Sequence, residues 1–457
     1  MPKPTNSKLQ IAMFPWFAYG HMIPFLQLAN ELAKRGHTIS FLLPKKALLK
    51  LASNNLHPHL ITFHSITVPH VPGLTPGAET TVEEKDSLVL SLAMDRTRDQ
   101  ARAILEKQKP DIVFFDLASW VPDLGLEIGF KTVYYKVMSP TTSAIKVTRI
   151  DLDKPLTAAN FMEPPPGYPS SKVLFKEYEA RRAVSAFNIH RDNVIKFLGR
   201  SDTGMRRCDL LAVKTVKELE GKYCDYLSTL YGKPVICTGP VLPEPKAKPL
   251  EAKFENWLEN FRPGSVIFCA LGSEWVLEKD QFKELLLGFE ETKLPFLVAL
   301  KPPKGTSTIE EGFPEGFQER VQNRGMVCGG WVPQDLILRH KSVGCFVNHC
   351  GYGSMWEALM SDCQLVFVPN ILDQSLNTRL MAEELEVAVE VERDENAGFS
   401  KESICKAVKS VMDDDSQVGW LVRKNHMKLK EVLNKPGFFT NYVDTFIEHL
   451  QGLLLVE

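Results

Sequence analysis

The sequence predicts an α/β protein of two doubly wound, Rossmann-like domains that face each other across a cleft. Short apolar runs of strand length alternate with helical stretches over most of the 457 residues, and this alternation is typical of parallel sheets covered by helices. The length suits two domains of roughly 200 residues each. A proline-rich stretch near the middle separates two such series. We therefore expect ligands at the carboxyl ends of the strands, in the cleft.

The first half opens with a strand–helix–strand unit. Residues 9–14 form an apolar run, residues 24–35 have helical periodicity that ends at Gly36, and residues 38–43 predict a second strand. Right-handed crossovers make such strands parallel. Further strands are predicted at 112–115, 131–135 and 210–213, and a helix at 87–107.

The middle of the chain predicts a linker. Between residues 239 and 253, four prolines alternate with Glu and Lys and leave little apolar material to pack. We predict a first domain at 1–240, a linker at 241–253, a second domain at 254–438, and a C-terminal helix at 439–457 that packs back on the first domain.

The second half repeats the alternation of strands and helices. Strands are predicted at 265–270, 296–300, 343–347 and 365–368, with helices at 279–290, 354–361 and 441–454.

Composition excludes several classes of function. The 54 basic and 56 acidic residues give a net charge of −2, so no overall field attracts nucleic acid or an anionic membrane. No apolar run approaches the ~20 residues that span a bilayer. Nine scattered cysteines without a Cys-x-x-Cys pair suit reduced thiols. We expect a cytoplasmic monomer that binds small molecules, without nucleic acid and without stable membrane insertion.

A glycine turn after the third predicted strand of the second domain is the most informative segment. Gly351 and Gly353 permit a tight turn before a helix predicted to begin at Ser354. The N–H groups of that helix start, the Ser354 hydroxyl and the His349 ring could bind a phosphate. Glu357 lies one turn further, where a carboxylate can accept hydrogen bonds from ribose. The alternative is a turn that only packs a helix on a strand.

The same turn does not match a dinucleotide site. Gly351 and Gly353 fit the first two glycines of G-x-G-x-x-G, but Trp356 stands at the third. An indole there prevents the close helix–strand packing that the glycine allows. A nicotinamide cofactor, and with it a UDP-sugar epimerase, is therefore discounted.

Residues 331–374 resemble the signature segment of the plant family 1 UDP-sugar-dependent glycosyltransferases. The matching positions are Trp331, Pro333, Gln334, Leu338, His340, Gly344, Phe346, His349, Gly351, Ser354, Glu357, Pro369, Asp373 and Gln374. The likeness covers nearly the whole chain, including Gly20-His21 and the linker. It implies a metal-independent glycosyltransferase of GT-B fold, with the UDP-sugar in the C-terminal domain, the acceptor in the N-terminal domain, and no further cofactor.

The resemblance also implies the donor contacts. Trp331 is similar to the tryptophan that stacks on uracil, Glu357 to the carboxylate that holds the ribose hydroxyls, and Gln334 to a contact beside them. His349 and Ser354 are implied to bind the diphosphate. The full implied set is Ser273, Trp331, Val332, Gln334, His349, Gly351, Gly353, Ser354, Glu357, Asp373 and Gln374.

The resemblance also implies which residues contact the diphosphate and the transferred sugar. Ser273 resembles a further diphosphate contact, and Asp373 with Gln374 resembles the pair that bonds the hydroxyls of the transferred sugar. Gln374 is similar to the glutamine of members that use UDP-glucose, which we take as the expected donor. UDP-rhamnose and UDP-xylose are the alternatives.

Two departures from the family pattern resemble one of its branches. Tyr352-Gly353 stands where Trp-Asn is common, and residues 362–364 read Asp-Cys-Gln where Gly-x-Pro is usual. Both resemble the branch that adds a sugar to a sugar. They imply inverting transfer to a sugar hydroxyl of a flavonoid or other phenolic glycoside. The alternatives are single-sugar transfer to an aglycone hydroxyl and a non-catalytic nucleotide-sugar binder.

A catalytic base is predicted at His21. It follows the first strand, near the helix start that Pro24 suggests, where a helix N-terminus keeps imidazole neutral. Asp116 follows the strand at 112–115, and neighbouring parallel strands would bring it to His21, which it could orient. The alternatives are a loop histidine with a backbone partner and an aspartate that caps a helix.

Aromatic residues crowd the loop beside His21. Phe14, Trp16 and Tyr19 could form the walls of an acceptor site, although aromatic residues at such positions could equally be core. The histidines between residues 57 and 70 lack the i, i+4 spacing of helical metal ligands, so no metal site is expected.

Overall fold

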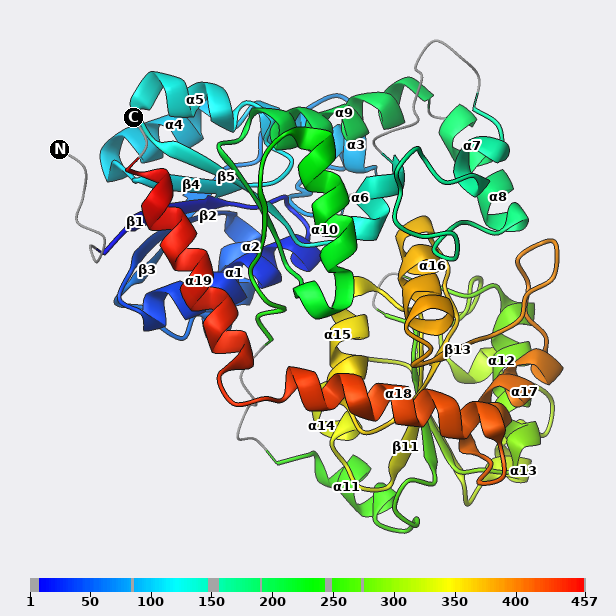
Figure 1. Cartoon of the computed structure of the whole chain (residues 1–457). Helices are drawn as coiled ribbons and strands as arrows, with labels where there is room; N and C mark the ends of the chain where they lie inside the picture. Colours follow the sequence, from blue (N-terminus) through cyan, green and yellow to red (C-terminus); the bar gives the residue numbers. More distant parts are fainter. Residues whose placement is uncertain are drawn as a thin grey trace.

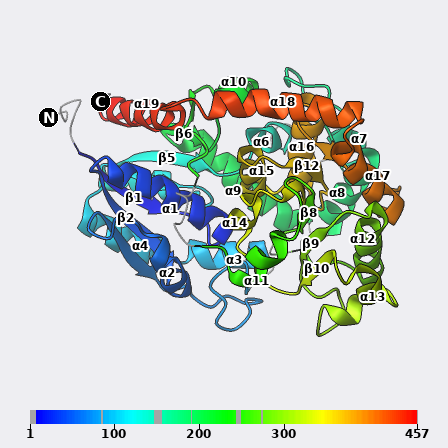
Figure 2. The ribbon, with the colours of Figure 1, turned by 90° about the horizontal axis from the view of Figure 1, so that it is seen from below.

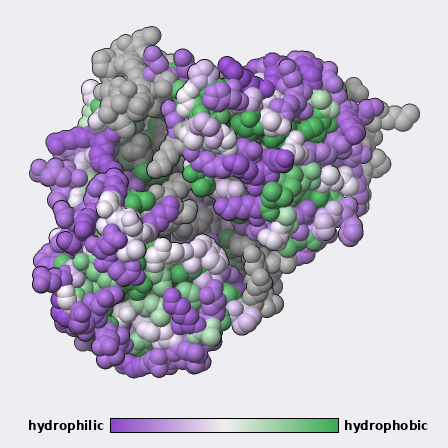
Figure 3. All heavy atoms as spheres, turned by 180° about the vertical axis from the view of Figure 1, so that it is seen from behind, coloured by the Kyte–Doolittle hydropathy of each residue, from purple (hydrophilic) through white to green (hydrophobic). Residues whose placement is uncertain are grey.

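The structure, a computed structural model, consists of two α/β lobes stacked one above the other (Figure 1). It describes residues 8–83, 86–146, 156–189, 191–242, 249–272 and 275–455. Seen from behind, the molecular surface is hollowed where the two lobes meet (Figure 3). No described helix is long and apolar enough to cross a bilayer.

The N-terminal sheet has seven parallel strands in the order β3-β2-β1-β4-β5-β6-β7. Its strands are β1 Gln10–Phe14, β2 Thr38–Pro44, β3 Ile61–Ile66, β4 Ile112–Phe115, β5 Lys131–Lys136, β6 Leu210–Val213 and β7 Val235–Cys237. The strand order reverses between β1 and β4, which pair with Phe14 opposite Phe115. Ligands bind at such a reversal, because the connections leave in opposite directions and open a crevice.

The C-terminal sheet has six parallel strands in the order β10-β9-β8-β11-β12-β13. Its strands are β8 Val266–Ala270, β9 Phe296–Ala299, β10 Gly325–Cys328, β11 Val343–Asn348, β12 Gln364–Phe367 and β13 Val389–Glu390. Here the order reverses between β8 and β11, where Ala270 lies opposite Asn348. Each sheet therefore has its own crevice.

Helices cover both faces of the two sheets (Figures 1 and 2). Those of the first half are α1 Tyr19–Lys34, α2 Lys45–Leu51, α3 Ser87–Asp95, α4 Arg98–Gln108, α5 Val121–Ile128, α6 Pro140–Lys146, α7 Ala159–Met162, α8 Glu177–Ile189, α9 Arg191–Arg207 and α10 Lys217–Tyr231. Those of the second half are α11 Ala252–Leu258, α12 Lys279–Thr292, α13 Phe317–Val321, α14 Gln334–Leu338, α15 Tyr352–Met360, α16 Leu372–Arg379, α17 Lys401–Met412, α18 Gln417–Leu433 and α19 Phe438–Leu453. Short 3-10 or π turns occupy Ala52–Asn54, Glu310–Gly312 and Leu380–Glu384.

The last helix returns to the first domain. Figures 1 and 2 show α18 on the C-terminal lobe and α19 on the N-terminal lobe, one after the other along one side. Val443, Phe446 and Leu450 of α19 are buried in the same core as Ile11, and the rings of Phe446 and Phe114 lie 6.0 Å apart. Burial of this apolar face holds the end of the chain on the first domain.

Several predicted elements differ from the structure. The helix predicted at 87–107 is two helices, because α3 ends at Asp95 and α4 begins only at Arg98; between them, both the N–H (3.0 Å) and the hydroxyl (2.6 Å) of Thr97 donate to the Met94 carbonyl in a tight turn. α1 begins at Tyr19, so Pro24 lies inside it, and α15 begins at Tyr352 rather than at Ser354. Apolar periodicity does not reveal a polar first turn.

Four strands were not predicted, and part of the predicted linker lies outside the described residues. The strands β3, β7, β10 and β13 are additional to those expected. Residues 243–248 of the predicted linker lie outside the described residues. The domain limits at 240 and 254 stay a prediction; the first sheet ends at Cys237 and α11 begins at Ala252.

Candidate active site

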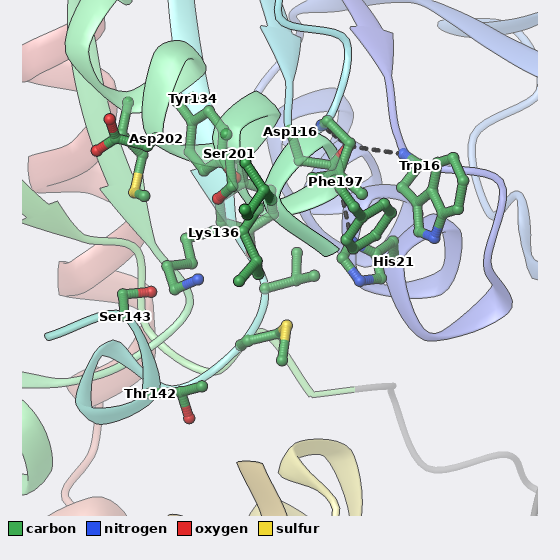
Figure 4. A pocket seen from close by; sticks show the side chains of 18 residues that line it. Trp16, His21, Asp116, Tyr134, Lys136, Thr142, Ser143, Phe197, Ser201 and Asp202 are labelled. Carbon is green, nitrogen blue, oxygen red and sulfur yellow. Dashed lines mark hydrogen bonds and ion pairs between the residues drawn. The ribbon is translucent and has the colours of Figure 1, made fainter. Parts of the chain in front are cut away.

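His21 and Asp116 meet at the crevice of the N-terminal sheet (Figure 4). His21 lies in the first turn of α1, immediately beyond β1, and Asp116 is the first residue after β4. Because β1 and β4 are neighbours, the His21 Nδ1 and Asp116 Oδ2 atoms lie 2.6 Å apart. The predicted juxtaposition of the two side chains is thus present in the structure.

The carboxylate of Asp116 is held by three contacts. Its Oδ1 atom accepts hydrogen bonds from the backbone N–H groups of Trp16 and Leu117, each 2.7 Å long, and its Oδ2 contacts His21. Asp116 is buried, whereas the His21 side chain is 20% exposed. A neutral imidazole that donates through Nδ1 leaves Nε2 as an acceptor. In this neutral form the ring presents Nε2, as an acceptor, on the side away from Asp116.

A cavity of about 320 Å³ opens beside this pair. Its size lies within the range of about 300–1,000 Å³ for small-molecule sites. The N-terminal domain supplies the lining, from the loop before α1, the ends of β4 and β5, and helices α6 and α9. The lining residues are Trp16, His21, Asp116, Leu117, Tyr134, Tyr135, Lys136, Val137, Met138, Thr142, Ser143, Ile195, Phe197, Leu198, Gly199, Ser201, Asp202 and Met205.

The cavity has an aromatic side and a polar side (Figure 4). Trp16 and Phe197 lie next to His21, with ring centroids 5.8 Å apart in an edge-to-face contact. Lys136 and Ser143 lie on the opposite side. Such a site can hold an apolar ring system and a polar substituent at the same time.

The three aromatic residues expected at this site have different surroundings. Trp16 lines the cavity. Phe14 is buried in the core beside the ring of Trp120, and Tyr19 lies under the ammonium group of Lys50, 4.3 Å from the ring centroid. Neither Phe14 nor Tyr19 is among the lining residues of the described structure. The contribution of α9 was not predicted, because its amphipathic pattern does not distinguish a core face from a pocket face.

Expected base- and ribose-binding residues gather around α14 and α15. Gln334 donates from Nε2 to Glu357 Oε2 (2.5 Å), which joins the start of α14 to the middle of α15. Burial raises the pKa of Glu357. The Trp331 side chain is 86% exposed, while its neighbour Val332 is buried. An indole this exposed offers a face on which a planar ligand can stack.

His349 lies between two glycines at the crevice of the C-terminal sheet. A Cβ atom on Gly272 would lie 2.7 Å from the His349 ring, and one on Gly351 would lie 2.6 Å from Nε2. Burial lowers the pKa of His349 to about 4, so the ring is neutral at pH 7. Its Nδ1 atom is buried without a hydrogen-bond partner in the described structure. Such a ring can bond a ligand without carrying charge.

The helix start beside His349 adds further donors. In α15 the first helical N–H bond is that of Met355 to the Gly351 carbonyl. The N–H groups of Tyr352, Gly353 and Ser354 precede it and point out of the helix end. This end of α15 is therefore suited to an anion. Ser273, the remaining expected diphosphate contact, lies outside the described residues.

Asp373 and Gln374 open α16. The Gln374 Oε1 atom accepts from the backbone N–H groups of Asn370 (2.9 Å) and Ile371 (3.3 Å). Its carbonyl thus caps the helix start, which leaves the amide NH₂ as the group available to a ligand. The charge of Asp373 acts on His349, which places the two side chains near each other.

Comparison with known proteins agrees with this architecture. The family described as UDP-glucoronosyl and UDP-glucosyl transferase matches residues 310–443. The chain is 54% identical to UDP-glycosyltransferase 79B9 of Arabidopsis thaliana over 97% of both chains. It is 50% identical to anthocyanidin 3-O-glucoside 2'''-O-xylosyltransferase of the same plant, over 98% of both.

Solved structures share the fold. A UDP-glucosyltransferase from Polygonum tinctorium superposes with a TM-score of 0.79 at 22% identity, covering 99% of this chain and 100% of that one. The structure of Phytolacca americana UGT2 superposes with a TM-score of 0.74 at 21% identity, covering 97% and 100%. The chain therefore belongs to the plant family 1 UDP-glycosyltransferases, has their GT-B fold, and transfers a sugar from a UDP-sugar to a small-molecule acceptor.

Proposed function

We propose that the protein inverts the anomeric centre of its donor in a single displacement, with His21 as the general base. The Nε2 atom of His21 takes the proton of an acceptor hydroxyl as that oxygen attacks the anomeric carbon. The bond from that carbon to the diphosphate breaks, and UDP leaves. The observation that carries this proposal is the 2.6 Å contact of His21 with buried Asp116 at the wall of the cavity. Asp116 orients the ring and stabilises its protonated form.

The leaving diphosphate is assigned to the N-terminus of α15. The N–H groups of Gly353 and Ser354, the Ser354 hydroxyl and the neutral His349 ring supply hydrogen bonds to the charge that develops on UDP. Trp331 stacks on the uracil, and Glu357, oriented by Gln334, accepts hydrogen bonds from the ribose.

UDP-glucose is the proposed sugar donor. The amide NH₂ of Gln374 and the carboxylate of Asp373, at the start of α16, are a donor and an acceptor suited to a polyol. UDP-xylose is the second candidate, because one relative at 50% identity is named a xylosyltransferase. UDP-rhamnose is the third.

The proposed acceptor is a glycoside of a flavonoid or another phenol, which receives the new sugar on its existing sugar. The same relative is named for an anthocyanidin glucoside acceptor. The cavity supports such a substrate with aromatic walls at Trp16 and Phe197 and polar groups at Lys136 and Ser143. A sugar hydroxyl is a much weaker acid than a phenol, so the reaction depends strongly on a positioned base.

The test compares an aglycone with its monoglucoside at matched concentration, using several UDP-sugars. Transfer should favour the glucoside by up to roughly 10⁴-fold, because an aglycone leaves polar groups of the site unpaired. The linkage of the product is determined by NMR, and the His21→Ala variant gives the background rate of transfer. Equal or faster transfer to the aglycone would favour the alternative of a single-sugar enzyme. Binding of UDP-sugar without any release of UDP would indicate a non-catalytic binder.

A further inference from the structure

The residue that opens α15 reaches into the other domain. The buried hydroxyl of Tyr352 lies 2.7 Å from the Lys214 carbonyl oxygen and 2.7 Å from Glu220 Oε2. Lys214 follows β6 of the N-terminal sheet, and Glu220 lies in α10. Figure 1 shows the start of α15 beneath the lower end of α10. The first residue of the anion-binding helix end is therefore fastened to the opposite domain.

Glu220 is the centre of a buried polar cluster. Its Oε1 atom accepts from the Ser139 hydroxyl and its Oε2 from the Thr215 hydroxyl, each at 2.5 Å. Glu220 is fully buried, and burial raises its pKa. α10 is kinked at this residue, where φ is −131° and ψ is 17°. The backbone of α10 thus departs from helical geometry at the residue that makes these contacts.

A proton count indicates the charge state of Glu220. The Tyr352 hydroxyl carries one proton, and the Lys214 carbonyl can only accept. Both contacts of Tyr352 are hydrogen bonds if its proton goes to Lys214 and a protonated Glu220 donates to the phenol oxygen. The neutral acid also avoids a buried charge without a cationic partner. Glu220 is thus a neutral carboxylic acid between the two domains.

The polar cluster around Glu220 also includes a residue next to the proposed acceptor cavity. Ser139 immediately precedes α6, whose residues Thr142 and Ser143 line the cavity. Tyr352 immediately precedes Gly353 and Ser354 of the proposed diphosphate site. One carboxyl group therefore links a segment of the acceptor cavity with a segment of the donor site.

We propose that Tyr352 is a positioning residue, which holds the diphosphate-binding end of α15 in register with the acceptor cavity through Glu220 and Lys214. The inference rests on the proposed donor site at α15. Its physical basis is that transfer requires the donor and acceptor groups, which belong to different domains, to be aligned closely. Misplacement by about 1 Å can cost on the order of 10² in rate.

The first variant is Tyr352→Phe in the full chain, which keeps the ring and removes the hydroxyl. UDP affinity, measured by calorimetry, should fall roughly tenfold, as the loss of a buried hydrogen bond allows. The turnover number should fall as well, while the KM for the acceptor should change less than about twofold, because the cavity lining is untouched. These kinetic effects separate positioning from a loss of stability alone.

The matched control is Tyr442→Phe. The Tyr442 hydroxyl donates to Glu218 Oε2 (2.6 Å) and accepts from the Lys217 N–H (2.8 Å), so it also joins a late helix to α10, but at Lys217 and Glu218 instead of Glu220. This variant should lower the melting temperature by an amount comparable to Tyr352→Phe and leave UDP affinity unchanged. If Tyr352→Phe behaves in the same way, Tyr352 is only structural and the inference is overturned.

Glu220 supplies a second test. Glu220→Gln can still donate to Tyr352 and accept from Ser139, and its second amide N–H can donate to the Thr215 hydroxyl oxygen, so UDP affinity should stay within about twofold of wild type. Glu220→Ala should weaken UDP binding as Tyr352→Phe does. A strong loss in Glu220→Gln would contradict the neutral acid. If the Ser354→Ala variant bound UDP as tightly as the wild-type protein, the proposed donor site at α15 would be wrong, and the inference that rests on it would be overturned as well.

Discussion

The His21 Nδ1 and Asp116 Oδ2 atoms lie 2.6 Å apart, although 95 positions of the chain separate the two residues. Each follows the carboxyl end of a strand, and the two strands are neighbours at the reversal of the strand order. The backbone N–H groups of Trp16 and Leu117 hold the other carboxylate oxygen. The orientation of the imidazole is therefore determined by the sheet and not by the loop alone.

Replacement of the proposed base should abolish most of the turnover. His21→Ala is expected to reduce the rate by roughly 10²–10⁴-fold, which is the usual contribution of a positioned base. UDP affinity should be nearly unchanged, because His21 faces the cavity of the N-terminal domain. The measurement is steady-state turnover together with UDP calorimetry. His59→Ala, at an exposed histidine of the same domain, is the control. A His21→Ala enzyme with wild-type turnover would remove this residue from the mechanism.

The proposed donor contacts should separate into base recognition and sugar recognition. Trp331→Ala should weaken UDP binding by roughly 5- to 150-fold, since stacking of a base on an aromatic ring is worth about 1–3 kcal/mol. Gln374→His should change the preference among UDP-glucose, UDP-xylose and UDP-rhamnose and spare UDP affinity.

A matched tryptophan is available as the control for this experiment. Trp420 of α18 is 62% exposed, and Trp420→Ala should leave UDP affinity unchanged. Calorimetry with UDP and product analysis with each UDP-sugar give the two readouts. The assigned roles would be reversed if Trp331→Ala altered sugar choice while Gln374→His did not.

Gly272 should be intolerant of a side chain. Its φ of +80° is strained for other residues, and a Cβ atom would lie 2.7 Å from the His349 ring. Gly272→Ala should therefore displace His349 and weaken UDP binding at least tenfold, as measured by calorimetry. Gly452→Ala is the control, because a Cβ there meets no atom within 4 Å. Unchanged UDP affinity in Gly272→Ala would show that the position of His349 is not needed by the donor.

A buried ion pair between the domains should contribute more to the free energy of unfolding than an exposed surface pair does. Arg379 Nη2 of α16 lies 3.0 and 3.1 Å from the carboxylate oxygens of Glu179 in α8, and its Nη1 contacts Glu390. All three side chains are at least 95% buried. Arg379→Ala should lower the free energy of unfolding by about 3–5 kcal/mol, because buried Glu179 loses its guanidinium partner and buried Glu390 is left with the exposed Lys176.

The exposed pair of Arg181 with Glu177 on α8 provides the comparison, since each side chain is 61% exposed. Arg181→Ala should cost about 0.5 kcal/mol or less. Urea unfolding of both variants is the measurement. If both variants lost the same free energy of unfolding, the cross-domain pair would contribute no more to stability than a surface contact.

Much of the fold and of the candidate site could be predicted from local patterns. The four-residue run Ile112–Phe115 is fully buried, as expected of a strand covered on both faces. Buried runs of this kind identify the strands. Because the strands are parallel, residues that follow neighbouring strands, such as His21 and Asp116, lie at the same edge of the sheet. The segment from Trp331 to Gln374 could likewise be assigned, from its resemblance to the signature segment of the family. The strands depend on residues close together in the sequence, whereas the meeting of His21 with Asp116 also depends on the parallel order of β1 and β4.

Only the tertiary structure decided which side chains face the cavity and which face the other domain. Phe14 and Trp16 are two positions apart and both are buried, yet only Trp16 lines the cavity. Phe197 enters the cavity from a helix far along the chain, and Tyr352 crosses to Glu220. The physical reason is that periodicity records only that a residue is buried. Its partner is determined by packing between elements that are distant in sequence, and no local pattern contains that information.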